Sequence, residues 1–433
     1  MTLVCAVAAV VLLAYGSIGL WYRLTGPAVP SPDTTNTDPA VVSALSTARR
    51  NVERRPGSAD MWGHLGKILR IHEFFAESDI CFARAAELNP RDPRWPYFLG
   101  RGQRGRDREK AEQYLRQAVA LGGNTVSPHF LLGELLLDEG RIDEAEPLFK
   151  QILLREPGNP RAIFAMARIA VSREKPDEAI AELERVVAAA PAVKAAHSLL
   201  AQLYARQGRQ ALANREAAVA AMLPEESTWA DPYQQELVAV WTGLEARLAV
   251  AQAMWSSGQQ RETIPFLRDV AKDYPSSARA QFLLGDRLNR LKEFVDAEVP
   301  LREAVRLDSD FSRAHFELGY SLQQQGKVVP AADAYRDAIR LQPDFALAYY
   351  DLSYSLITQR DIPAAIAALQ DAVRFAPGLT PAYARLAGLL KSQGRDREAR
   401  DVLEQAASLR RPSNTSEPAQ EPETDIRPPE INR

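Results

Sequence analysis

A proline returns along this chain at a fixed interval. Pro157 and Pro191 lie 34 residues apart, and so do Pro343 and Pro377. Each of these prolines follows an alanine-rich stretch with helical spacing, and proline ends a helix because it lacks a backbone N–H donor. A fixed period predicts an array of one small unit, in which each unit buries its apolar side against its neighbours. We therefore expect the function on the surface that stacking creates, and not in a single pocket.

The first unit carries large apolar residues, a small residue and a closing proline at fixed offsets. These residues are Trp62, Leu65, Gly66, Phe82, Ala85 and Pro90. The frame recurs from residue 59 to about residue 411 and resembles the tetratricopeptide repeat family. The resemblance implies two antiparallel helices in each unit, since the small residue lets the backbones approach and the large ones fill the gap. It predicts an all-α, right-handed superhelical solenoid of about ten helix-turn-helix units.

The repeats fall into two arrays of five units, at residues 59–224 and 244–411, with an irregular connector at 225–243. Residues 38–56 hold apolar side chains at helical spacing without a partner helix before them. They predict a helix that caps the N-terminal end of the array.

The connector contains the start of a helix. Asp231 and Pro232 are typical of an N-cap followed by a first-turn proline, and apolar residues then keep helical spacing as far as Ser256. We predict one long helix from Tyr233 to Ser256. This helix either bridges the two arrays rigidly or marks a hinge between them.

The N-terminal segment gives a second strong signal. Residues 2–22 carry no charged side chain and are long enough to cross a bilayer, and Trp21 and Tyr22 lie where an interfacial aromatic belt is expected. We predict a single N-terminal transmembrane helix within residues 1–23, with lipid contact through residues 2–22 and a cleaved signal peptide as the alternative. Arg23 follows the apolar stretch. Counting positive charges favours a cytoplasmic array over an extracytoplasmic one in this single-pass membrane protein.

Two further segments differ in composition from the repeats. Residues 24–37 hold prolines among Ser, Thr and Asp, which indicates a semi-rigid, extended spacer. Residues 412–433 lose the periodicity and are rich in proline and acidic residues. This composition predicts a disordered tail.

Charge and cysteine content exclude several classes of protein. The formal net charge is −3 with 25% charged residues, so no basic field extends along the molecule and nucleic acid is not an expected partner. Cys5 and Cys81 cannot form a disulfide framework or a metal-binding Cys pair motif. The chain has no HExxH, GxSxG or phosphate-loop motif. We therefore predict no catalytic residue, no metal and no cofactor.

The histidines have a simple explanation within the repeat. His129, His197 and His315 occupy the position that Trp62 holds in the first unit. They lie a unit or more apart, so we interpret them as packing substitutes within the helix pairs.

Aromatic residues recur on the first helix of the units. Six of them lie three residues before the small position: Tyr97, Phe130, Phe164, Phe282, Phe316 and Tyr350. Tyr320 and Tyr354 extend the same stripe. Because first helices line the concave face in the family that the chain resembles, we predict an aromatic groove that binds a protein or peptide segment. The alternative is that the rings pack between neighbouring first helices.

Basic side chains gather on the first two units. They are Lys67, Arg70, Arg94, Arg101 and Arg104. They are candidate contacts for an acidic segment of a partner, with solvated surface charge as the alternative. The Asn residues with which some members of the family clamp a terminal carboxylate are missing from the equivalent positions, so that clamp is not expected.

The sequence thus predicts a non-catalytic, membrane-anchored scaffold or adaptor that binds other proteins. Two alternatives stay open. One is a structural or oligomerisation module, which would form a homo-oligomer. The other is an accessory subunit of an envelope biogenesis system, such as cytochrome maturation or polysaccharide export.

Overall fold

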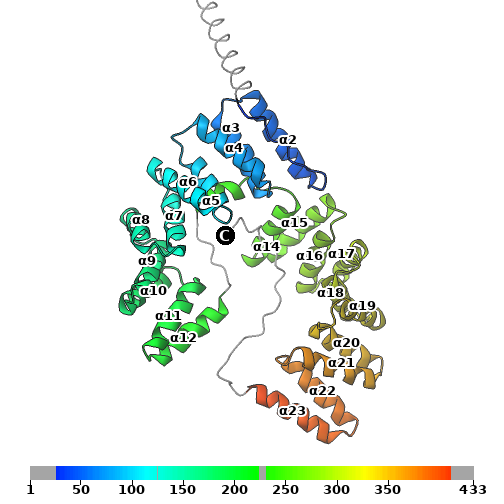
Figure 1. Ribbon diagram of the computed structural model, residues 1–433. Coiled ribbons are helices and arrows are strands. Elements are labelled where there is room, and N and C mark those ends of the chain that lie inside the picture. The colour runs from blue at the N-terminus through cyan, green and yellow to red at the C-terminus, as the bar shows by residue number, and fades with distance from the viewer. Residues whose placement is uncertain (1–25, 124, 224–230, 411–433) are drawn as a thin grey trace, which may run out of the picture. The chain divides into compact units, whose positions relative to one another are not determined.

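A computed structural model describes residues 26–123, 125–223 and 231–410, and every regular element in these ranges is an α-helix (Figure 1). The described residues divide into two compact units. Unit 1 ends at Gly243 and unit 2 begins at Leu244. The boundary lies at the end of the connector between the two predicted arrays.

Unit 1 consists of a leading helix, five helix pairs and a short final helix. In chain order these are α2 (Pro39–Arg54), α3 (Ala59–Ile71), α4 (Phe75–Leu88), α5 (Arg94–Gln103), α6 (Arg108–Leu121), α7 (Ser127–Asp138), α8 (Ile142–Arg155), α9 (Pro160–Ser172), α10 (Pro176–Ala189), α11 (Lys194–Arg206), α12 (Gln210–Met222) and α13 (Pro232–Val238). Helix α2 lies within the range predicted for a capping helix and packs on α3.

Unit 2 consists of five helix pairs. In chain order its helices are α14 (Leu244–Ser256), α15 (Gln260–Asp273), α16 (Ala278–Arg290), α17 (Phe294–Leu307), α18 (Ser312–Gln324), α19 (Val328–Leu341), α20 (Ala346–Thr358), α21 (Ile362–Phe375), α22 (Thr380–Ser392) and α23 (Asp396–Arg410). In both units each first helix packs on its own second helix, and that second helix packs on the next first helix.

Small residues set the spacing within the pairs, as the repeat pattern predicts. A Cβ atom on Gly66 of α3 would lie 2.9 Å from Cε1 of Phe82 on α4. A Cβ atom on Gly319 of α18 would lie 2.7 Å from Cε1 of Tyr335 on α19. Both rings are completely buried. The closely packed ring of the second helix therefore requires glycine on the first helix.

The long helix predicted from Tyr233 to Ser256 is wrong, because the chain forms two helices there. Helix α13 ends at Val238, and Gly243, just before α14, has a φ of 90° that no α-helix accommodates. A Cβ atom on Gly243 would lie 2.8 Å from Oδ2 of Asp38, so the chain passes close to the start of α2 at this point. The two helices bury their apolar residues in different units, Tyr233 and Leu237 of α13 in unit 1 and Leu248 and Ala251 of α14 in unit 2.

The start of α13 is confirmed. Oδ1 of Asp231 accepts hydrogen bonds from the backbone N–H groups of Tyr233, at 3.0 Å, and Gln234, at 3.3 Å. Asp231 is therefore the N-cap, and Pro232 occupies the first helical position.

The predicted transmembrane helix requires a correction. Within the three described ranges no helix is both long and apolar enough to cross a membrane. The longest, α2, has 16 residues, whereas a spanning helix needs about 20 apolar ones. Residues 1–23, to which that prediction refers, lie outside the described residues. The predicted fold class is corrected to an all-helical solenoid of paired helices, and the predicted single-pass membrane location is withdrawn.

Candidate functional site

First helices of successive pairs contact one another in both units. Helix α7 contacts α9 in unit 1, and α18 contacts both α16 and α20 in unit 2. We call these surfaces the first-helix face of unit 1, formed by α3, α5, α7, α9 and α11, and the first-helix face of unit 2, formed by α14, α16, α18, α20 and α22. All the aromatic residues proposed from the sequence as contacts lie on these helices.

These aromatic residues differ in exposure. Three are buried: Tyr97, Phe130 and Phe282. Four are half-buried: Phe164, Phe316, Tyr320 and Tyr350. The side chain of Tyr354 is 47% exposed. Tyr354 is therefore the most accessible ring of the set.

Two of the phenylalanines pack between repeats. The ring of Phe282 lies 4.6 Å from that of Phe311, and the ring of Phe316 lies 4.9 Å from that of Phe345. In both cases the second ring belongs to the residue just before the next first helix. A recurring contact of this kind fixes the stacking of one pair on the next.

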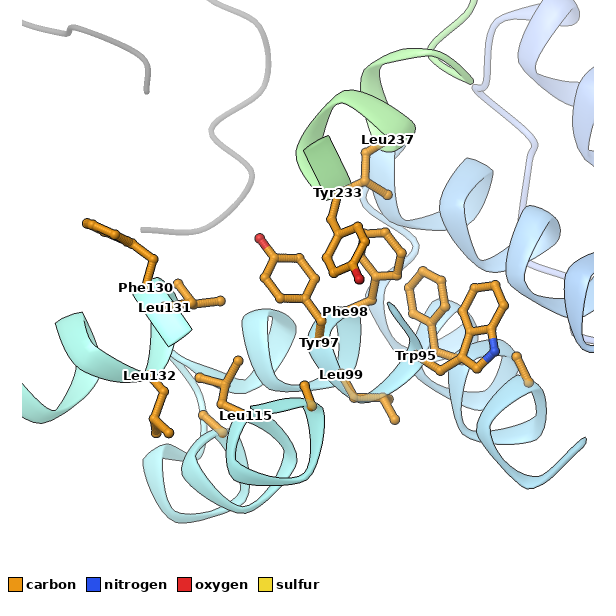
Figure 2. Packing of buried hydrophobic residues seen from close by; sticks show 14 of the residues in the cluster. Trp95, Tyr97, Phe98, Leu99, Leu115, Phe130, Leu131, Leu132, Tyr233 and Leu237 are labelled. Atoms are coloured by element: carbon orange, nitrogen blue, oxygen red, sulfur yellow. The ribbon is translucent and has the colours of Figure 1, made fainter. Parts of the chain in front are cut away.

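Helix α13 covers part of the first-helix face of unit 1. The hydroxyl of Tyr97 on α5 donates a hydrogen bond to Oδ2 of Asp231 at 2.5 Å. Figure 2 shows the ring of Tyr233 beside those of Tyr97 and Phe98, with centroid distances of 4.9 and 6.1 Å. Leu237, one turn further along α13, is fully buried. Burial raises the pKa of Tyr97, and it raises that of Tyr233 to about 12, so both hydroxyls keep their protons at neutral pH.

Charged residues hold the same helix. Nζ of Lys67 on α3 lies 3.0 Å from Oε2 of Glu236 on α13, and Nη1 of Arg94 lies 3.7 Å from the same oxygen. Arg94 also contacts Asp92 at 2.6 Å and Asp60 at 3.2 Å. The hydrogen bond to Asp92 is the main cause of the raised pKa of Arg94. The face and α13 are thus complementary in charge.

The five basic residues proposed from the sequence do not form one patch. Lys67 and Arg94 meet at Glu236, as described above. Arg101 lies next to Tyr97, where its charge opposes the rise in the pKa of the tyrosine. Arg70 is buried against Ser78 and Asp79, and Arg104 contacts Asp138 at 2.9 Å on the next pair.

On the first-helix face of unit 2, two tyrosines and an arginine form a cluster. The guanidinium carbon of Arg385 lies 4.0 Å from the ring centroid of Tyr350 and 5.9 Å from that of Tyr354. Nη1 of Arg385 also donates to the backbone oxygen of Tyr350 at 3.3 Å. Arginine on the face of a ring adds a cation–π attraction and restrains both side chains. Tyr354 lies at the exposed edge of this cluster.

Two carboxyl groups on this face were missed by the sequence analysis. Glu317 and Asp351 occupy equivalent positions, each directly after an aromatic residue of the stripe. Nδ2 of Asn289 donates to Oε2 of Glu317 at 2.8 Å. Burial raises the pKa of Glu317 to about 7, with Asp286 adding to the rise, and burial raises the pKa of Asp351 to about 6. Their 34-residue spacing is the signal in the sequence that could have identified them.

Two of the three histidines, His197 and His315, take the packing role of the tryptophan, as the sequence predicted. Nε1 of Trp62 donates to the backbone oxygen of Pro56 at 2.9 Å. Nε2 of His197 lies 3.0 Å from the oxygen of Pro191, and Nε2 of His315 lies 3.0 Å from that of Ser309. In all three the oxygen lies six residues before the ring. These two histidines therefore make the same bond as the tryptophan.

Comparison with protein families identifies the repeat. Models described as tetratricopeptide repeat match residues 101–160, 136–203, 301–344, 316–380 and 380–412. A curated relative, cellulose synthase operon protein C of Pseudomonas fluorescens (strain SBW25), is 23% identical over 261 residues, which cover 57% of this chain and 20% of that protein. The match thus extends over about a fifth of the relative.

Solved structures of MamA are also similar. One is 24% identical and has a TM-score of 0.36, with coverage of 37% of this chain and 93% of MamA. Another, MamA 41-end from Desulfovibrio magneticus RS-1, is 18% identical with a TM-score of 0.37, and the match covers 39% of this chain and 95% of that one.

Proposed function

Because this chain belongs to the tetratricopeptide repeat family, we propose that it is a non-catalytic protein-interaction scaffold that holds a partner segment on the first-helix face of unit 2. The role of a protein-interaction scaffold comes with the repeat family. We propose further that Tyr320, Tyr350 and Tyr354 form the contact surface.

One structural observation supports this proposal. In unit 1 the face built from the equivalent helices holds a helical segment, α13, with Tyr97 as a central contact. Tyr350 occupies in unit 2 the position of Tyr97 in its repeat, three residues before the small position. Among the described residues of unit 2, no segment covers it as α13 covers Tyr97, and Tyr354 stays 47% exposed.

The chemistry of the unit 2 face suits a polypeptide. Tyrosines offer a large apolar area and a hydroxyl at low cost in side-chain entropy, and Arg385 keeps two of them oriented. Glu317 and Asp351 add carboxyl groups that can accept hydrogen bonds from backbone or side-chain N–H groups. Tyrosine and arginine are enriched at the centres of protein interfaces, and both are present on this face.

A photo-crosslinking amino acid in place of Tyr354, followed by mass spectrometry, would identify the contacted segment. Affinity for that segment is then measured with purified Tyr320→Ala and Tyr354→Ala variants. We expect each change to weaken binding by about tenfold or more, because central aromatic contacts dominate interfaces.

The matched control is Phe375→Ala, which removes a 37% exposed ring from the second helix α21. It should leave the affinity unchanged. Unaltered binding by the two tyrosine variants, with circular dichroism like that of the wild type, would remove the proposal.

A second role has one observation in its favour. The curated relative is named for a cellulose synthase operon, which points to an accessory subunit of polysaccharide export. Deletion of the gene in its native host, with polysaccharide secretion as the readout, tests this role. Normal secretion would exclude it and leave the scaffold role standing.

A further inference from the structure

The face of unit 1 that α13 covers has the properties of a binding site with a ligand in place. We infer that the first-helix face of unit 1 is a second protein-binding site, specific for a short acidic helix of the form Asp-Pro-Tyr-x-x-Glu-Leu, and that residues 231–237 of this chain are its intramolecular ligand. The site is distinct from the unit 2 face of the proposed function, so either can fail without the other.

The contacts that hold α13 are long-range in sequence. Tyr97 and Asp231 are 134 residues apart, and Lys67 and Glu236 are 169 residues apart. Helix α13 has seven residues, too few for a stable helix in water on its own. Its helical form therefore depends on docking, as that of a bound peptide does.

Each element of the recognition pattern has a separate contact on the face. The N-cap carboxylate of Asp231 accepts the hydrogen bond of Tyr97, and the ring of Tyr233 lies edge-on to that of Tyr97. Glu236 lies between Lys67 and Arg94. Tyr233 and Glu236 are three residues apart, about one helical turn, so their side chains lie on the same side of α13.

The charges of the face account for the acidic character of the ligand. Burial lowers the pKa of Arg161 on α9, and the charges of Glu134 and Asp231 oppose this effect. Arg94 keeps Asp92 and Asp60 as partners without α13, and Arg161 keeps Glu134. Removal of α13 takes Glu236 from Lys67 and Asp231 from the hydroxyl of Tyr97, so an acidic segment of another protein fits in its place.

The ion pair at the edge of the site is accessible to solvent. The side chains of Lys67 and Glu236 are 14% and 29% exposed, and that of Arg94 is 30% exposed. Partly exposed ion pairs of this kind contribute modestly to stability and strongly to the choice of partner. Detachment of α13 therefore separates groups that water can solvate again, while the α3/α4 and α5/α6 pairs stay folded.

The test uses the full-length protein and an N-acetylated, fluorescein-labelled peptide of residues 231–243. In the ligand variant Asp231→Ala/Tyr233→Ala, the chain's own segment is weakened and the face is intact. We expect fluorescence anisotropy to show at least about tenfold tighter binding of the peptide to this variant than to the wild type, where the intramolecular ligand competes.

Charge reversal shows whether the peptide occupies the proposed site. Lys67→Glu, added to the ligand variant, should weaken binding at least about tenfold, because two carboxylates then face each other, and a peptide with Glu236→Lys should recover part of the loss. Tyr354→Ala, a change in unit 2, should have no effect. If the folded ligand variant binds the peptide no better than the wild type, or if Lys67→Glu has no effect, the inference is overturned.

If the ligand variant does not fold, hydrogen exchange measured on the wild-type protein tests independently whether α13 detaches. We expect the amides of Leu237 and Val238 to exchange at least about a hundredfold faster than those in the centre of α5, because α13 detaches while unit 1 stays folded. Excess unlabelled peptide should accelerate this exchange further. Equal exchange rates in α13 and α5 would show that α13 separates only when unit 1 unfolds, which overturns the inference.

Discussion

The hydroxyl of Tyr97 donates a 2.5 Å hydrogen bond to the carboxylate of Asp231, which also caps helix α13. A single carboxylate thus starts a helix and attaches it to the first-helix face of unit 1. The bond is buried, and its acceptor is charged, which places it among the stronger hydrogen bonds of proteins.

Replacement of Tyr97 by Phe removes this bond and keeps the ring. We expect the free energy of unfolding of unit 1 to fall by about 1–3 kcal/mol, because a buried charged acceptor loses a donor. Urea unfolding followed by circular dichroism measures the change. Tyr354→Phe, at an exposed ring, is the control and should stay within about 0.5 kcal/mol of the wild type. Equal stability of the two variants would show that the bond does not hold α13.

The carboxyl group of Glu317 makes the stability of unit 2 depend on pH. Burial raises its pKa from 4.5 to about 7, so the folded state binds a proton that the unfolded state releases above about pH 4.5. The stabilisation is present at low pH and is lost as pH rises towards 7. Glu317→Gln should remove this part of the pH dependence, on the order of 1–2 kcal/mol between pH 5 and pH 7 once partial solvation is allowed for. Melting temperatures of the wild type and of Glu317→Gln, measured between pH 5 and pH 7, test this expectation. If the two curves of melting temperature against pH run parallel, Glu317 is not the group responsible.

Two glycines of the first helices of unit 2 should respond to alanine in opposite directions. A Cβ atom at Gly319 would lie 2.7 Å from the ring of Tyr335, whereas a Cβ atom at Gly388 would meet nothing within 4 Å. We expect Gly319→Ala to destabilise unit 2 by about 1–3 kcal/mol through overpacking. Gly388→Ala should stabilise it by about 0.5–1 kcal/mol, because alanine favours the helix. Thermal unfolding of the two variants provides the comparison, and a stabilising Gly319→Ala would show that the repeat tolerates a wider gap.

The thiol of Cys81 should be unreactive in the folded protein. It is completely buried, and burial and the neighbouring Glu77 raise its pKa, so very little thiolate is present at neutral pH. In a Cys5→Ser background we expect a thiol reagent to label Cys81 at least about a hundredfold more slowly than in urea. A cysteine at the exposed position Ser276, in a chain without Cys5 and Cys81, is the control for a free thiol. Fast labelling of Cys81 would show that the α3/α4 pair opens readily.

The periodic part of the fold could be predicted from the sequence, because the same local contact recurs in every pair. The spacing from Gly66 to Phe82 and from Gly319 to Tyr335 places a small residue opposite a large one, and the structure confirms both contacts. The bond that His197 makes in place of Trp62 likewise follows from the repeat position.

The docking of α13 could not be predicted in the same way. The contact between Tyr97 and Asp231 joins two segments with different periodicity, so no repeat position relates them. Helical spacing also continues through Trp241 and Leu244, which led to the wrong prediction of one long helix. The break depends on the backbone at Gly243 and on burial of Leu237 in unit 1, and neither follows from spacing alone.

The carboxyl groups of the unit 2 face were missed for another reason. Glu317 and Asp351 directly follow aromatic residues of the stripe, and an acidic residue on a surface helix is usually solvated. The neighbouring first helices supply Asn289 beside Glu317 and Arg385 beside Asp351, and each of these residues lowers the pKa of the carboxyl group that it faces. The raised pKa values therefore come from burial, which outweighs both contacts, and helical spacing alone does not reveal it.

The return of α13 to α3 and α5 changes how unit 1 can fold. Within the described residues of unit 2, the main contacts join helices that are adjacent or next-adjacent in the chain, which favours stepwise growth from any pair. In unit 1, the bond between Tyr97 and Asp231 closes a loop of 134 residues and gives the native state a non-local contact. Such contacts slow folding, because loop entropy is lost before the contact forms. Unit 1 is thus an array whose last segment can dock only after its first pairs exist, which sets an order of assembly that unit 2 does not need.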